Sequence, residues 1–281
     1  IKGGAAVMAK IQKTANTADK KPVYRVKEKP TAMGILATLF FTIISIIFVS
    51  PIIIVIINSL KAKTFISLET FELPNEHSYI GLDNYKTAIT QYDFIKAVGW
   101  TVVITVLSVA AILLFCSMTA WYITRVKNIA TKIIYLLCVF SMVIPFQMVM
   151  FTLAGTADAL HLTTPWGIVI VYLGFGTGLA VFMFCGFIKS IPLEVEEAAM
   201  IDGCTPLKTF FRVVIPIMKP TYISVGILEA MWIWNDFLLP YLVLDIKKYK
   251  TISIVVQYMK GSYGRVDMGA IMACLVMAII P

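Results

Sequence analysis

The sequence lacks several patterns on which soluble enzymes depend. Only two of its 281 residues are histidines, His77 and His161, and no Ser–His–acid or His–Glu–His arrangement includes them. It also has no G-x-x-x-x-G-K-[ST] stretch, the loop whose backbone N–H groups cradle ATP phosphates. These absences argue against a catalytic chain and against one that hydrolyses ATP by itself.

Charge and paired cysteines are also scarce. Charged residues make up 14% of the chain and hydrophobic residues 59%, so several membrane-spanning helices are expected. The net charge of +8 does not indicate a nucleic-acid partner, because Lys and Arg lie between apolar runs and form no single patch. The five cysteines include no C-x-x-C pair, and we interpret them as small hydrophobic residues.

Long apolar runs predict an all-α, polytopic membrane protein with six transmembrane helices. Five runs are expected to cross the membrane, with approximate bounds 34–57, 97–123, 133–153, 166–188 and 222–244. Pro51 predicts a kink in the first, and Pro145 an interruption in the third. A sixth run from Met268 has about fourteen residues, short of the roughly twenty needed, so it is either a partial span or cut short at Pro281.

The first 32 residues differ from the transmembrane domain that follows at 33–281. They carry eight basic residues against two acidic ones, which is typical of a tail held beside anionic lipid on the cytoplasmic face. Four predicted spans separate this tail from a polar segment at 189–220, so both lie on one side. That side holds most of the chain's 24 Lys and Arg, which favours the cytoplasm. The basic stretch at 245–265 opposes the rule, and nothing in the sequence explains it.

The polar segment at 189–220, which we term the elbow, predicts two short helices. Pro192 suits the first turn of the first helix, and Gly203 suits its end. Thr205 is placed to cap a second helix that Pro206 opens and Pro216 ends. The second helix is expected to bury one apolar face made of Leu207, Phe210, Phe211 and Val214.

The elbow resembles the EAA loop of ABC importer permeases. The matching residues are Glu197, Ala198, Ala199, Asp202, Gly203, Val213, Ile215 and Pro216, with Val for the usual Ile and Ile for the usual Leu. In that family the loop docks into a cleft on a separate ATP-hydrolysing subunit and passes its motion to the membrane helices. The resemblance therefore implies that this chain binds no cofactor and that ATP is held by partner subunits. An ordinary loop with a chance Glu-Ala-Ala is the alternative.

Three shorter stretches also resemble sugar-importer permeases, namely Asn58-Ser59-Leu60-Lys61, Asn84-Tyr85 and Trp234-Asn235-Asp236-Phe237. Overall the chain is most similar to the second permease of maltose-type carbohydrate importers. The resemblance implies a multi-pass protein of a bacterial cytoplasmic membrane that forms half of a path for a sugar. It further implies a second homologous permease, two ATP-binding subunits and an extracellular or periplasmic sugar-binding protein as partners.

Two acidic residues fall inside the fifth apolar run. Glu229 and Asp236 are seven residues apart and are expected to share a helix face with Trp232 between them and Asn235 beside Asp236. An ionisable group at mid-bilayer costs about 3 kcal/mol, which suggests function. These four residues are therefore candidates for a translocation path. Hydrogen bonding to neighbouring helices, with Asp236 near the outer interface, is an equally open interpretation.

Two other functions are compatible with these features. Glu229 and Asp236 could carry protons in an ion-coupled secondary transporter, or the chain could be a membrane-anchored scaffold that transports nothing. Gly174, Gly176 and Gly178 lie within the fourth run, where no strand precedes them. We therefore interpret them as residues for close helix packing and not as a nucleotide-binding fingerprint.

Overall fold

The computed structural model describes residues 31–259 and 266–280, and this part of the chain is helical without a β-strand, which confirms the all-α class. Most of the predicted basic tail, together with Lys260, Arg265 and Pro281, lies outside the described residues. The helices in chain order are α2 (Ala32–Ser59), α3 (Lys63–Leu68), α4 (Asp83–Gln91), α5 (Phe94–Arg125), α6 (Ile129–Phe140), α7 (Phe146–Ala159), α8 (Gly167–Ile188), α9 (Leu193–Ile201), α10 (Pro206–Thr209), the π-helical turn η1 (Phe210–Val214), α11 (Ile215–Ile217), α12 (Lys219–Asn235), α13 (Leu238–Val243), α14 (Ile252–Met259) and α15 (Met268–Ile279).

The chain divides into two compact units, residues 1–51 and 52–281, and the division falls inside α2. The described part of the first unit is the N-terminal portion of α2, whose apolar side chains, among them Leu36, Phe41 and Phe48, are exposed. α2 is long and apolar enough to cross a bilayer, which confirms the first predicted apolar helix. The backbone of α2 stays helical through Pro51.

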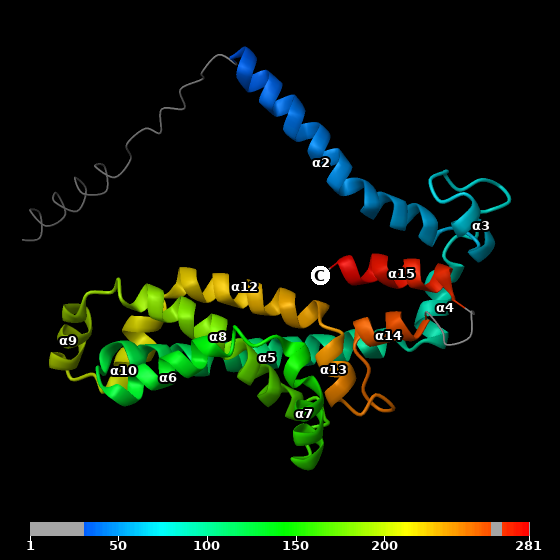
Figure 1. The fold of residues 1–281 in the computed structure, drawn as a ribbon. Helices are drawn as coiled ribbons and strands as arrows, with labels where there is room; N and C mark the ends of the chain where they lie inside the picture. Colours follow the sequence, from blue (N-terminus) through cyan, green and yellow to red (C-terminus); the bar gives the residue numbers. More distant parts are fainter. Residues whose placement is uncertain (1–30, 260–265, 281) are drawn as a thin grey trace, which may run out of the picture. The chain divides into compact units, whose positions relative to one another are not determined.

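The second unit is organised around α5 and α8, which lie side by side (Figure 1). α12 packs against both, and α6 packs against α8. Buried apolar side chains fill the space between these helices, including Ile112, Ala120, Phe184 and Val225. The 32 residues of α5 extend over about 48 Å. α5 and α8 are each long and apolar enough to span a bilayer, which confirms long apolar helices in the second and fourth predicted runs.

Close packing at α8 depends on two of the three glycines in its G-x-G-x-G stretch, Gly174, Gly176 and Gly178. A Cβ atom on Gly176 would lie 2.6 Å from Ile112 Cδ1, and one on Gly178 would lie 2.8 Å from Ser141 Oγ. A Cβ on Gly174 would meet nothing within 4 Å. The predicted role in helix packing is therefore confirmed for Gly176 and Gly178, whereas Gly174 has open space beside it.

We expect Gly178→Ala to lower the free energy of unfolding by about 1–3 kcal/mol, because the added methyl group must displace α6 from α8. Gly174→Ala is the matched control and is expected to leave stability nearly unchanged. The thermal midpoints of the two purified variants in detergent micelles give the comparison. An equal decrease in both would contradict the packing assignment.

The third and fifth predicted spans differ from the observed helices. The third run forms α6 and α7 with a break before Pro145, as that residue predicts. The fifth run was predicted to continue to 244, but α12 ends at Asn235. Asp236 adopts an extended conformation, and its carboxylate accepts the N–H groups of Leu238 and Leu239, which starts α13 as a separate helix.

The number of spans stays a prediction. Among the described residues, three helices are long and apolar enough to cross a membrane by themselves. The helical segments Pro206–Ile217 and Lys219–Asn235 are bent by 79° relative to each other. They supply a fourth span if they are counted together as one. α6 and α15 are apolar but shorter.

The two ends of the α5–α8 bundle carry different elements. α9 and α10 of the elbow lie at one end, and α4, α14 and α15 gather at the other (Figure 1). At the second end, Phe94, Ala97 and Cys274 belong to a separate buried cluster, and the Ile252 N–H donates to Thr101 Oγ1 at 3.0 Å. α5 therefore connects the elbow physically to the far end of the unit.

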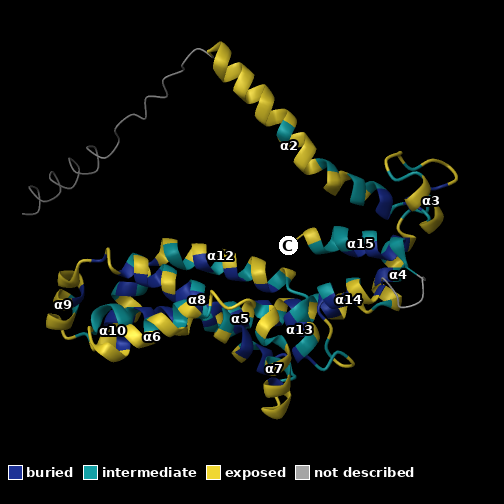
Figure 2. Ribbon diagram, viewed as in Figure 1, coloured by how far each residue is buried: buried dark blue, intermediate teal, exposed yellow. Residues whose placement is uncertain are grey.

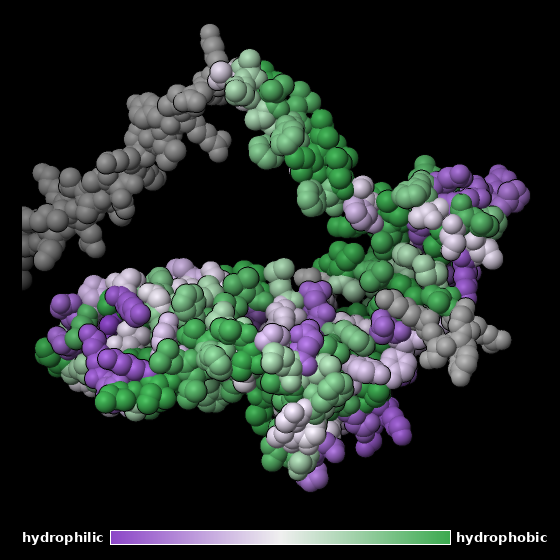
Figure 3. Space-filling model, in the orientation of Figure 1, coloured by the Kyte–Doolittle hydropathy of each residue, from purple (hydrophilic) through white to green (hydrophobic). Residues whose placement is uncertain are grey.

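The surface of the second unit is largely apolar along the bundle. Exposed apolar side chains are frequent there, for example Phe115 on α5 and Leu136 and Phe140 on α6. Exposed residues recur along α6 and α12 in Figure 2. Hydrophobic residues gather along the bundle, and hydrophilic residues cluster at the end that carries α9 and α10 and again near α13 and α3 (Figure 3). Such an extensive exposed apolar surface is that of a protein embedded in lipid. All five cysteines are free thiols, and Cys116, Cys185 and Cys274 are buried.

Candidate functional site

The first helix of the elbow ends as its glycine predicts. Gly203 has a φ of +86°, in the left-handed region that favours glycine. Its N–H donates to the Met200 carbonyl, and the Cys204 N–H donates to the Ala199 carbonyl, each at 3.0 Å. These two bonds form a Schellman motif, which satisfies carbonyls at the end of α9 and turns the chain sharply.

The second helix begins as predicted but does not end at Pro216. The Thr205 side chain accepts the Lys208 N–H at 3.4 Å, and Pro206 stands in the first turn. The chain then widens into the π-helical turn η1, in which the Ile215 N–H reaches back to the Phe210 carbonyl. This wider turn lets the helix continue through Pro216, and the direction changes only at Met218.

The four apolar residues of the second helix do not share one buried face, so that prediction is wrong. Phe210 and Val214 are fully buried, whereas Leu207 is 58% and Phe211 48% exposed. The helix packs along one edge of the expected stripe only, which leaves the other edge on the surface. Met200 and Ile201 of α9 are exposed as well. The elbow therefore presents apolar side chains outward from both of its helices.

The residues that match the EAA pattern lie on the surface of the elbow. Glu197, Ala198, Asp202, Gly203 and Pro216 are exposed, and Ala199 is half-buried. Within residues 31–259 and 266–280, the Glu197 carboxylate has no ion-pair or hydrogen-bond partner. The fold thus leaves this carboxylate, with its neighbouring small residues, available to a partner.

Glu196, the residue directly before the motif, points inward and is 2% exposed. Its Oε1 accepts Arg125 Nη2 at 2.6 Å and Arg125 Nε at 3.0 Å, and its Oε2 accepts Trp121 Nε1 at 2.9 Å. Arg125 Nη2 also donates to the Ile191 carbonyl at 3.0 Å. We refer to Trp121, Arg125 and Glu196 together as the brace.

The brace joins the elbow to the end of α5. The Trp121 ring also packs against the Phe210 ring of η1, with centroids 5.4 Å apart, so α5 contacts both helices of the elbow. An Arg guanidinium that meets a carboxylate through two nitrogens has a fixed geometry. Because removing one partner leaves the other charge buried, the brace resists separation of α9 from α5.

The brace was not predicted from the sequence. A signal was present, because Trp121 and Arg125 are four residues apart at the end of an apolar run and therefore share a helix face. The sequence did not indicate which of two consecutive glutamates would meet them.

The fold gives the four predicted path residues different surroundings, although Trp232 and Asp236 both contact Tyr172. Glu229 is buried, and its Oε2 faces Gly176 and has no hydrogen-bond partner in the described part of the chain. Trp232 is partly exposed and meets the Tyr172 ring edge-to-face at a centroid distance of 5.6 Å. Tyr172 OH donates to Asp236 Oδ2 at 3.1 Å.

The expectation that Glu229 and Asp236 share one helix face is wrong, because α12 ends before Asp236. Asp236 serves as the acceptor for the start of α13 and for Tyr172, which is a structural role. Asn235 lies with Trp234 and Thr105 on a cavity of about 420 Å³ between α5, α12 and α15, whose lining includes neither Glu229 nor Trp232.

Two of the shorter family-like stretches are brought together at the far end. Asn84 Nδ2 donates to the carbonyls of Ser59 and Lys61 at 2.8 and 2.9 Å, and Ser59 Oγ and Tyr85 OH are 2.7 Å apart. The Lys61 ammonium group is buried and donates to the carbonyls of Glu69 and Glu72. These contacts build a compact polar cluster that orders the segment between α2 and α4.

Residues 114–281, which contain the elbow, the brace and α12, match the family described as binding-protein-dependent transport system inner membrane component. The chain belongs to this family. This membrane component is 38% identical over 247 residues to a probable starch degradation products transport system permease protein, AmyC, of Thermoanaerobacterium thermosulfurigenes, with 88% of each chain covered. It is also 35% identical over 208 residues to the multiple sugar-binding transport system permease protein MsmG of Streptococcus mutans, with 73% of each covered.

Solved structures agree on the fold. The membrane component resembles a chain of a bacterial ABC transporter involved in the import of the acidic polysaccharide alginate, with a TM-score of 0.71 and 20% sequence identity. The similarity covers 89% of this chain and 92% of that chain. The membrane component is therefore an integral membrane protein of a transport family, and not a member of a catalytic one.

Proposed function

We propose that this chain is one of two membrane-spanning subunits of an ATP-driven ABC importer and forms half of the path for a sugar or oligosaccharide. The names of its relatives support this substrate class, because they include permeases for starch degradation products, multiple sugars and arabinooligosaccharides. The proposed partners are a second homologous permease, two ATP-binding subunits and an extracellular or periplasmic sugar-binding protein. ATP is held by the ATP-binding subunits, so this chain needs no cofactor and catalyses no reaction.

The proposed coupling element is the elbow. The observation that supports this proposal most directly is that Glu196 and Glu197 point in opposite directions. Glu196 is tied inward to Arg125, while the motif from Glu197 to Gly203 faces outward. Glu197 would anchor the contact with the ATP-binding subunit, and the small side chains of Ala198 and Ala199 would permit close docking. Asp202 and Gly203 would form the bend between the two helices of the elbow. Pro216 would stand near the end of the elbow, just before the chain enters α12.

Motion of the ATP-binding subunits would then reach the membrane through the brace. Because Trp121 and Arg125 belong to the last turns of α5, a displacement of the elbow pulls on a helix that runs the length of the bundle. We place the elbow and the N-terminus in the cytoplasm, since most of the chain's Lys and Arg lie on that side. The cellular location is a bacterial cytoplasmic membrane.

The proposed path runs beside α12. Asn235 and Trp234 line the cavity that opens there, and an indole ring can stack on the C–H face of a sugar while an amide hydrogen-bonds its hydroxyl groups. Glu229 and Trp232 would act nearby on the same helix. Asp236 would shape the path only indirectly, by holding Tyr172 and the start of α13.

Reconstituted transport with the charge-reversed variant Glu197→Lys tests the coupling proposal. We expect sugar uptake to fall by at least about tenfold, because a misplaced charge in a docking contact costs several kcal/mol. The measurements are sugar uptake and sugar-stimulated ATP hydrolysis in liposomes that contain the purified complex. The matched control is Glu194→Lys, an exposed residue of the same helix outside the motif, which is expected to transport within about twofold of the unchanged complex.

Full uptake and full ATP hydrolysis in Glu197→Lys would contradict the docking role. Uptake by the isolated chain under a proton gradient without ATP would instead support ion-coupled transport. The two outcomes are separable, because only the second is independent of the ATP-binding subunits.

A further inference from the structure

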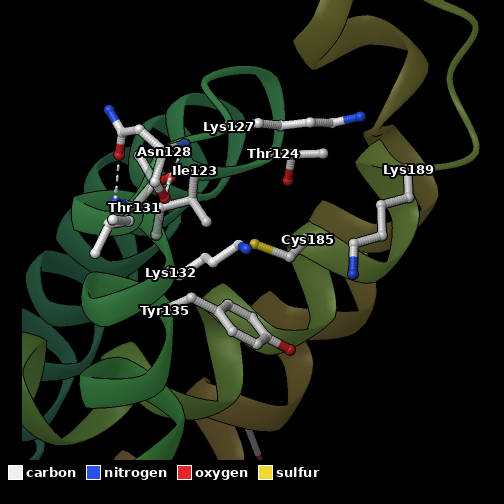
Figure 4. Close-up of a pocket in the computed structure, with 10 residues that line it drawn as sticks. Ile123, Thr124, Lys127, Asn128, Thr131, Lys132, Tyr135, Cys185 and Lys189 are labelled. Carbon is white, nitrogen blue, oxygen red and sulfur yellow. Dashed lines mark hydrogen bonds between the residues drawn. The ribbon is translucent and has the colours of Figure 1, made fainter.

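A basic pocket lies at the elbow end of the bundle, on the side of α6. It is a cavity of about 570 Å³ between the end of α5, the start of α6 and the end of α8 (Figure 4). Three lysines line it, Lys127 from the turn between α5 and α6, Lys132 from α6, and Lys189 after α8. The remaining lining includes Tyr135 and Cys185 and no acidic side chain.

The lysines face a common space without a neutralising partner. Figure 4 shows Lys132 and Lys189 reaching from opposite sides, with Lys127 above them and the Tyr135 ring below. The Lys189 ammonium group lies 5.9 Å from the centroid of the Tyr135 ring. Throughout the described residues, no carboxylate oxygen lies within 4.0 Å of any of the three ammonium groups. Their mutual repulsion would be relieved by a bound anion.

Beyond the pocket, α6 carries exposed apolar side chains. From the pocket toward the end of α6, the exposed side chains are apolar, namely Ile133, Leu136, Leu137 and Phe140. The inner lining of the pocket, with Ile123 and Cys185, is also apolar. The three lysines of the pocket, with exposed apolar side chains along the same helix, match a molecule that has an anionic head and hydrocarbon tails. A free phosphate ion would contact only the lysines.

We propose that this pocket binds an anionic phospholipid, with the phosphate group held by Lys132 and Lys189 and the acyl chains lying along α6. Basic pockets between transmembrane helices recognise anionic headgroups through charge-assisted hydrogen bonds. The turn that contributes Lys127 follows Arg125 of the brace directly, so the bound lipid steadies the part of α5 that holds the elbow. This inference goes beyond the proposed function and does not depend on coupling to ATP.

The test uses the full chain, purified with the subunits that accompany it, and adds phosphatidylglycerol or phosphatidylcholine in defined molar amounts. Bound lipid is counted by native mass spectrometry, and the thermal midpoint is followed in parallel because a ligand of the folded state raises it. We expect phosphatidylglycerol to bind and to raise the midpoint, and phosphatidylcholine to do neither. Lys132→Gln/Lys189→Gln should bind phosphatidylglycerol at least about tenfold more weakly.

Two further variants distinguish lipid binding by the lysines of this pocket from attraction to any positive charge on the protein. Lys132→Arg/Lys189→Arg keeps both cations and should retain binding. Lys208→Gln/Lys219→Gln removes two exposed charges from the same end of the bundle outside the pocket, and it should bind like the unchanged chain. An equal loss in this control overturns the proposal in favour of diffuse attraction.

Two other results would also overturn the proposal. If glycerol 3-phosphate or inorganic phosphate raises the thermal midpoint as phosphatidylglycerol does, the pocket is a site for a soluble anion. If phosphatidylglycerol binds the isolated chain but not the chain with its partner subunits, the pocket is a protein interface. If the glutamine variant does not fold, the comparison of phosphatidylglycerol with phosphatidylcholine and with glycerol 3-phosphate on the unchanged chain still decides the question.

Discussion

Glu196→Ala is expected to lower the free energy of unfolding by about 3–5 kcal/mol and to abolish uptake. The substitution leaves the largely buried Arg125 guanidinium without its carboxylate and removes the acceptor of Trp121 Nε1. α9 loses its attachment to α5 at the same time. Thermal unfolding of the purified chain measures the first effect, and uptake in liposomes measures the second.

The adjacent residue gives an unusually close control. Glu197→Ala changes the same side chain one position along α9, but that side chain is exposed and unpaired among the described residues. It should leave stability within about 0.5 kcal/mol of the unchanged chain. If both alanine variants unfold at the same temperature, the inward orientation of Glu196 is wrong.

A compensating pair distinguishes folding from coupling. Arg125→Met/Glu196→Leu removes both charges and fills a similar volume, which often restores the stability that a single substitution loses. We expect the thermal midpoint to recover, while uptake stays low because apolar contacts do not fix the elbow as a two-nitrogen ion pair does. Full recovery of uptake would show that the brace contributes packing alone.

Gly203→Pro is expected to reduce uptake by at least about tenfold while ATP binding by the complex persists. Proline holds φ near −65°, whereas Gly203 has a φ of +86° and an N–H that donates to Met200. The chain therefore cannot end α9 with the same turn, and the two helices of the elbow change their relative direction. The ratio of sugar molecules transported to ATP molecules hydrolysed is the measurement.

A graded series at this position tests the role of backbone conformation. Alanine in the left-handed region costs roughly 1–2 kcal/mol, so Gly203→Ala should be intermediate. Asparagine tolerates this region, so Gly203→Asn should retain most uptake. Equal losses with asparagine and proline would show that a side chain at the docking surface, and not the bend, causes the defect.

The sequence by itself determined the features that depend on local chemistry and on long apolar runs. α2, α5 and α8 follow from uninterrupted apolar segments, because only a helix satisfies the backbone of such a segment in lipid. The end of α9 at Gly203 and the start of α10 after Thr205 follow from residues whose conformational preferences are strong. The family-like pattern of the elbow was readable for the same reason.

Only the tertiary structure decided where helices continue or stop at weaker signals. Pro216 was expected to end a helix, but the π-helical turn before it lets the helix continue through the proline. Phe210 of that turn packs on Trp121. Asp236 looked like part of a long span, but its carboxylate starts α13 and meets Tyr172, 64 residues earlier in the chain. In both cases a contact with a residue far away in sequence, Trp121 or Tyr172, stabilises one of several local conformations of similar energy.

The tertiary structure alone also assigned the two glutamates of the elbow. Consecutive residues on a helix point about 100° apart, and both are carboxylates, so no local rule says which one is buried. The position of α5 decides it, because Arg125 and Trp121, 71 and 75 residues away in sequence, both donate to the Glu196 carboxylate. The long-range ion pair turns one acid inward, and that orientation directs Glu197 toward solvent.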